Sequence, residues 1–115
     1  MARLPYKDEI DGASGVSYIF DVFTCDHTFD DVRAVYIFAK KPIPYNELYY
    51  EPLYIDWTDA LGSTVKNHTK WPCINKHGCT HICVFSVSDI DEEWDEWKKE
   101  AVADLIQQHN PPCND

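Results

Sequence analysis

The chain has 115 residues, of which 44% are hydrophobic and 26% are charged, as in an ordinary globular domain. Asp and Glu number 20 against 10 Lys and Arg, so the formal net charge is −10. A protein that attracts phosphates over a distance carries the opposite sign, which disfavours direct binding of nucleic acid. No apolar run approaches the roughly 20 residues of a membrane span, and no secretory signal is recognisable. We therefore expect a cytoplasmic protein with no membrane contact.

In chain order, residues 1–15 are polar and predict a loosely tied N-terminal arm, followed by a single domain over residues 16–115. The β-branched and aromatic segments predict strands at 16–24, 34–41, 53–55 and 80–87. The proline-rich stretch 42–52 predicts an extended loop between two of these strands.

Two helices are predicted in the second half of the chain. The first rests on the helical spacing of Trp57, Leu61, Val65 and His68, with Thr58 or Asp59 as its N-cap. The second begins near Ser88 and Asp91 and ends before Pro111 and Pro112. Its apolar face is expected to consist of Ile90, Trp94, Trp97, Ala101 and Leu105.

The five cysteines are Cys25, Cys73, Cys79, Cys83 and Cys113. An odd number excludes a complete set of internal disulfides, and we expect reduced thiols. Cys73, Cys79 and Cys83 alternate with His77 and His81, which raises the question of a zinc site. Their spacing lacks the C-x2-C knuckle, and the segment 80–85 has the composition of a strand, so we expect no metal there.

Four segments in order resemble the GIY-YIG nuclease superfamily: AVYIFAKK (34–41), EPLYIDWTDALGSTVKNH (51–68), KWPCINKHGCTHICVF (70–85) and ADLIQQHNPPCN (103–114). The resemblance implies an α/β (α+β) domain with a central, short, mostly antiparallel three-stranded sheet flanked by helices. It also implies an ancestral site that hydrolyses phosphodiesters with one divalent cation, an arginine and a glutamate.

The resemblance matches family site positions to Tyr36, Tyr54, His68 and Asn114, which we interpret as relict positions. Thr64 stands at the position of the phosphate-binding arginine, and Val102 at that of the metal-binding glutamate. Thr64 offers no guanidinium fork and Val102 no metal ligand. Ala34 and Asp56 replace signature glycines, and Asp56 adds negative charge beside the expected phosphate. The resemblance therefore predicts a protein without catalysis and without a metal cofactor.

Residues 89–104 contain eight acidic residues and two lysines, a net charge of −6. Such a run is either a solvated helix face or a surface for a basic partner. The candidate partner-binding residues are Asp89, Asp91, Glu92, Glu93, Asp95 and Glu96, with Asp56 and Asp59 as a second group.

The leading hypothesis is an inactive GIY-YIG-like acidic protein that binds a nucleic-acid-binding protein through the partner's basic surface. It would inhibit a DNA-handling protein by DNA-like negative charge, as phage or mobile-element proteins directed against host defence do. Two alternatives stay open. One is a residual metal-dependent endonuclease that uses Tyr36, Tyr54 and His68, and the other is a scaffolding or peptide-binding domain.

Overall fold

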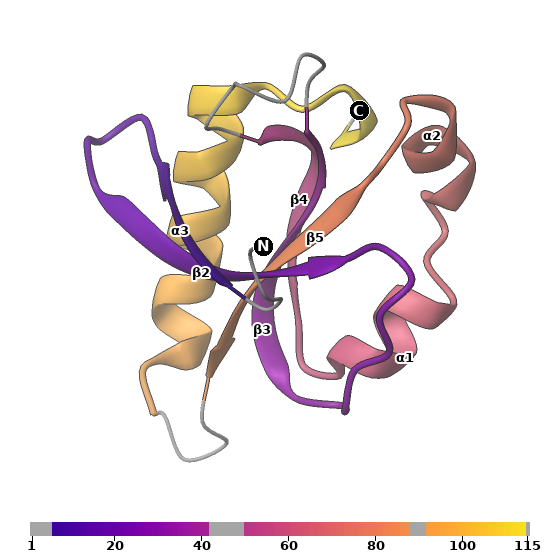
Figure 1. Ribbon diagram of the computed structural model, residues 1–115. Coiled ribbons are helices and arrows are strands. Elements are labelled where there is room, and N and C mark those ends of the chain that lie inside the picture. Colours follow the sequence, from indigo (N-terminus) through magenta and orange to yellow (C-terminus); the bar gives the residue numbers. More distant parts are fainter. Residues whose placement is uncertain (1–5, 42–49, 88–91, 115) are drawn as a thin grey trace.

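The computed structural model describes residues 6–41, 50–87 and 92–114 (Figure 1). In chain order the elements are β1 (Tyr6–Asp11), β2 (Ser17–Thr24), β3 (Arg33–Lys40), β4 (Glu51–Thr58), α1 (Leu61–Lys66), α2 (Trp71–Lys76), β5 (His81–Val87), α3 (Trp94–His109) and the 3-10 turn η1 (Pro112–Asn114). The strands form one sheet in the order β1-β2-β5-β3-β4, and every neighbouring pair is antiparallel.

The expected three-stranded sheet is wrong, because the sheet has five strands. The additional edge strand β1 lies in the stretch predicted to be an arm and pairs with β2 from Tyr6↔Val22 to Asp11↔Ser17. Its composition did not indicate a strand because Ile10 is the one buried side chain among residues 7–11. Strand β5, the last in sequence, lies between β2 and β3 at the centre of the sheet.

The sheet is buried on both faces, as the alternation along β3 shows. Val35 and Ile37 point into one apolar cluster, whereas Tyr36 and Phe38 point into another on the opposite face. The long helix α3 covers the first face, and α1 and α2 cover the second (Figure 1). The sheet is therefore the middle of three layers.

The first helix begins later than predicted. Thr58 is the last residue of β4 and pairs there with Ala34 of β3, so α1 starts only at Leu61. Ala60 is the N-cap of α1, and no side chain caps the helix. The Thr58 hydroxyl instead accepts a hydrogen bond from the Ala60 N–H at 3.0 Å. The connection after residue 68 contains a helix of its own, α2, with Pro72 in its first turn.

Helix α3 follows the predicted apolar face, since Trp94, Ala101 and Leu105 are buried. Its predicted start at residues 88–91 lies outside the described residues. The strand predicted at 53–55 extends over Glu51–Thr58 and includes Pro52 at the edge of the sheet. Of the helices described, none has the length and apolarity needed to span a bilayer.

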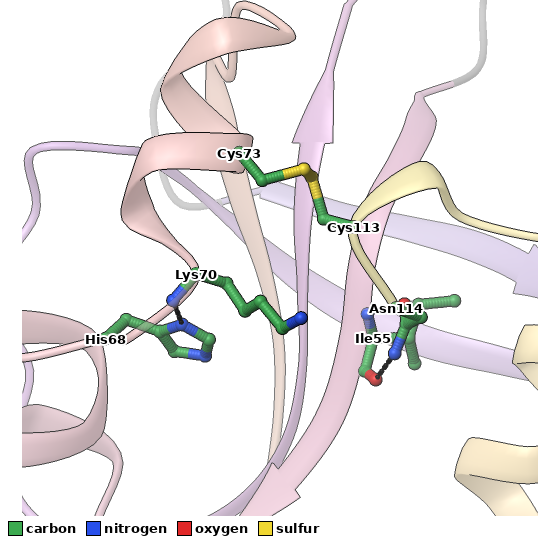
Figure 2. The surroundings of a disulfide bond; sticks show 6 residues. All are labelled: Ile55, His68, Lys70, Cys73, Cys113 and Asn114. Carbon is green, nitrogen blue, oxygen red and sulfur yellow. Dashed lines mark hydrogen bonds between the residues drawn. A yellow bond between two sulfur atoms is a disulfide. The ribbon is translucent and has the colours of Figure 1, made fainter.

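The expectation that all thiols are reduced is wrong for one pair. Cys73 of α2 and Cys113 of η1 form a disulfide with their Cα atoms 5.8 Å apart (Figure 2). Cys25, Cys79 and Cys83 are free. The two bonded cysteines are 40 residues apart, and only the return of the chain after α3 brings η1 beside α2.

Candidate functional site

A polar cluster lies on the sheet face covered by α1 and α2. The Tyr36 hydroxyl of β3 is 2.8 Å from Nε2 of His68, which follows α1. The Tyr54 hydroxyl of β4 donates a hydrogen bond to the Asp56 carboxylate at 2.8 Å. The tyrosine and histidine rings are in mutual contact, with centroids 4.8–6.2 Å apart. The structure thus brings together Tyr36, Tyr54 and His68, three of the four positions that the resemblance selected.

The hydrogen bonds of His68 determine which of its two ring nitrogens carries the proton. The Lys70 N–H donates to Nδ1 at 3.0 Å (Figure 2), so the neutral ring carries its proton on Nε2 and donates it to Tyr36. The Tyr36 and Tyr54 hydroxyls interact in turn. A continuous polar chain therefore runs from the Lys70 backbone to the Asp56 carboxylate.

The environment favours the neutral form of each ring in this chain. Burial, followed by the negative charge of Asp56, raises the pKa of Tyr36. Burial and the hydrogen bond to Asp56 raise the pKa of Tyr54. Burial also lowers the pKa of His68, although Asp56 opposes this effect. Both phenols are protonated at neutral pH, so each hydroxyl is available to donate and to accept a hydrogen bond.

An open hollow lies beside the cluster, lined by Tyr54, Asp56, Thr64, Asn67 and His68 among others. Its described lining residues include the Asp56 carboxylate and no Lys or Arg. The Thr64 hydroxyl, at the position expected for the arginine, is held by the Thr58 hydroxyl at 2.6 Å. Among the lining residues that the structure describes, the charged group that a phosphate in this hollow would meet is the Asp56 carboxylate.

Val102 lies on the far side of the sheet from the tyrosines. It is buried in the α3-facing cluster with Val35 and Ile55, whereas Tyr36 belongs to the α1- and α2-facing cluster. A carboxylate at position 102 would therefore be separated from Tyr36 and Tyr54 by the sheet.

Asn114, the fourth position that the resemblance selected, binds the backbone of β4. Its side-chain amide donates to the Ile55 carbonyl and accepts from the Ile55 N–H, both at 2.9 Å (Figure 2). It thereby fixes η1 against β4 beside Tyr54, without joining the polar chain.

The acidic candidates separate into two places. Those at the start of α3 are exposed, namely Glu92, Glu93, Asp95 and Glu96. Asp59 joins them, because its carboxylate accepts a 2.7 Å hydrogen bond from the Trp94 indole. Asp56 lies in the hollow with Tyr54 instead. Asp89 and Asp91 lie outside the described residues.

Lys98 shapes this acidic surface and was not singled out from the sequence. Its ammonium lies 3.7 Å from the centroid of the Trp57 ring and 2.7 Å from the Asp95 carboxylate, and the residue is 5% exposed. Lys99 is consequently the basic residue of α3 that stays exposed. The ammonium also lies 5.4 Å from the centroid of the Trp94 ring, and the i, i+4 spacing of Trp94 and Lys98 was the sequence signal for that contact.

Asp104 has a structural role. It accepts hydrogen bonds from the Ser14 backbone, the Ser14 hydroxyl and the Tyr18 hydroxyl, at 2.7–2.9 Å, and so connects α3 to the β1–β2 hairpin.

Comparison of the chain with protein-family models, with curated proteins and with solved structures finds no match.

Proposed function

We propose that this is a non-catalytic acidic protein of the cytoplasm that binds the basic surface of a nucleic-acid-binding protein and inhibits it by DNA-like charge. The observation that carries the proposal is the start of α3, where exposed carboxylates are joined by Asp59 while Lys98 is buried. Because Lys98 is paired with Asp95, the negative charge of this surface comes mainly from the exposed residues Glu92, Glu93, Glu96 and Asp59.

The polar cluster supports the non-catalytic part of the proposal. Both tyrosines have a raised pKa, and the adjoining hollow presents the Asp56 carboxylate without a described Lys or Arg. These features disfavour both the base and the phosphate contact that a nuclease needs. A residual nuclease remains the alternative that an activity measurement must address.

Charge complementarity predicts fast association that weakens as salt is added, because exposed charges are screened. The test begins with capture of partners by tagged protein from nuclease-treated native lysate, washed at low and at high salt. We expect a basic, nucleic-acid-binding protein that high salt releases. A partner retained at high salt favours the scaffolding alternative.

Two matched variants then locate the binding surface. Glu92→Lys with Glu96→Lys reverses two charges at the start of α3, whereas Glu9→Lys with Glu51→Lys makes the same charge change on exposed residues of β1 and β4. We expect the captured partner to lose affinity for the first variant and to bind the second much as it binds the wild type. Equal affinities for both variants contradict the proposed surface.

The nuclease alternative has its own measurement. Magnesium-dependent cleavage of DNA by the wild type that disappears in Tyr54→Phe would overturn the non-catalytic proposal. We expect no cleavage by either protein.

A further inference from the structure

Three side chains of the metal-ligating type meet where η1 lies beside α2. Cys73, His77 and Cys113 place their possible ligand atoms within 4.8 Å of one another. Cys73 and His77 are one helical turn apart, at the body and the C-cap of α2, and Cys113 comes from η1. The sequence placed Cys73 and His77 together but gave no indication of Cys113.

The distances among these three ligand atoms suit a small cation with tetrahedral coordination. Around zinc, with Zn–S of about 2.3 Å and Zn–N of about 2.0 Å, neighbouring ligand atoms lie about 3.5–3.8 Å apart. Atoms already within 4.8 Å reach that spacing by small side-chain rotations. His77 is exposed, so its ring is free to turn towards the sulfurs and a fourth position is open to water.

The disulfide and a metal exclude each other, because the bond between the sulfurs removes both thiolates. We propose that reduction of the Cys73–Cys113 disulfide creates a zinc site formed by the Cys73 and Cys113 thiolates and the His77 imidazole. Two molecules of a low-molecular-weight thiol supply two electrons and two protons, which gives two cysteine thiols and the disulfide of the reductant. Zinc then replaces the two thiol protons, which are released to solvent.

The ligands stay close after the disulfide opens, because other contacts hold η1 in place. The Asn114 amide keeps its two hydrogen bonds to Ile55, and these do not involve sulfur (Figure 2). Cys113 is also buried in the apolar cluster that contains Ile74 of α2. The reduced site is therefore organised before the metal arrives, which lowers the entropic cost of binding.

Cys79 and Cys83 are less suited to this site. The Cys79 thiol donates a hydrogen bond to the His81 carbonyl at 3.5 Å. Cys83 of β5 is fully buried in the cluster that α3 covers. Neither belongs to the group of ligand atoms that lie within 4.8 Å of one another.

The test uses Co²⁺, whose thiolate complexes are coloured, on the whole chain. A phosphine first reduces the disulfide and is itself converted with water to the phosphine oxide. We expect one equivalent of cobalt to give sulfur-to-cobalt charge-transfer bands in the reduced protein, none in the oxidised protein, and loss of the bands when zinc displaces cobalt. A reduced protein that gives no such bands overturns the proposal.

Variants assign the ligands. Cys113→Ser should abolish the charge-transfer bands of a two-thiolate site, and His77→Gln should weaken binding by more than the roughly 10–100-fold that loss of an outer-shell contact costs. The matched control Cys79→Ser should bind as the wild type does. Because His77 is exposed, His77→Gln leaves the fold intact, so unchanged affinity in that variant overturns the assignment even if a cysteine variant fails to fold.

Discussion

The Tyr36 hydroxyl and Nε2 of His68 are 2.8 Å apart, and this contact joins β3 to the segment after α1. Tyr36 is 1% exposed, so its hydroxyl depends on protein partners rather than on bulk water. Because the Lys70 N–H occupies the other ring nitrogen, the direction of this hydrogen bond is set by the backbone. Protonation of Nδ1 would remove the acceptor of the Lys70 N–H, so the two contacts of the His68 ring are made together only by a neutral imidazole.

Acidification should destabilise the protein through His68. Burial lowers the pKa of His68, with Asp56 opposing and Lys70 adding to the effect, so the unfolded chain binds a proton at higher pH than the folded chain does. This contribution to stability is present above the ordinary histidine pKa of about 6.5 and is lost as the pH falls through the lower folded value. His68→Gln should flatten the pH dependence of the urea unfolding free energy in this window.

A second histidine should contribute in the same direction, since burial lowers the pKa of His81 as well, and His81→Gln tests this contribution. Each single variant should remove part of the slope and the double variant more. A His68→Gln protein with the wild-type slope would show that His68 does not carry the effect.

Asn114→Ala should reduce stability. The substitution removes two 2.9 Å hydrogen bonds to Ile55, a residue with 0% exposure, and should cost about 1–2 kcal/mol in unfolding free energy. Asn67→Ala is the control, because exposed Asn67 makes a single 3.2 Å side-chain bond to the Ser63 carbonyl. Chemical denaturation should show a change below about 0.5 kcal/mol for the control. Equal losses in both variants contradict the role given to Asn114.

Reduction of the disulfide should lower stability in metal-free buffer. The cross-link closes a segment with a sequence separation of 40, for which loop entropy predicts about 4 kcal/mol. Urea unfolding with a chelator, with and without reductant, measures this difference. Cys73→Ser with Cys113→Ser should show the lower stability without reductant and no further response to it. A wild type that is insensitive to reductant contradicts the expectation.

Lys98→Met should destabilise the packing of α3 on β4. Methionine retains much of the aliphatic stem but removes the ammonium from the Trp57 face and from Asp95, which should cost about 0.5–2 kcal/mol. Lys99→Met removes the same charge from an exposed neighbour and should be nearly neutral. Thermal unfolding of the pair at equal salt distinguishes the two cases, and equal melting temperatures would contradict the cation–π assignment.

The sequence predicted those helices and strands whose own residues show an apolar periodicity or an apolar composition. The face of α3 follows from the spacing of Trp94, Ala101 and Leu105, and β3 follows from its continuous apolar composition. β1 was missed because a charged edge strand has little such signal, and Thr58 stayed in β4 because ladder pairing prevailed over its capping preference.

Part of the candidate site could likewise be predicted from the sequence. The resemblance selected Tyr36, Tyr54 and His68, which meet in the fold. The sequence did not indicate that Val102 lies across the sheet, nor that Cys113 reaches Cys73, because both depend on the path of the chain around the sheet.

The hydrogen bonds of Asn114 also bear on how the edges of the sheet are protected. β1 and β4 are the outer strands in the sheet order, and an open edge invites a strand from another copy. On β4, the Asn114 amide occupies both backbone groups of Ile55, as a neighbouring strand would. On β1, Lys7 and Glu9 place charge along the margin. Both borders of the sheet thus resist strand addition, which protects a densely aromatic chain from aggregation by edge pairing.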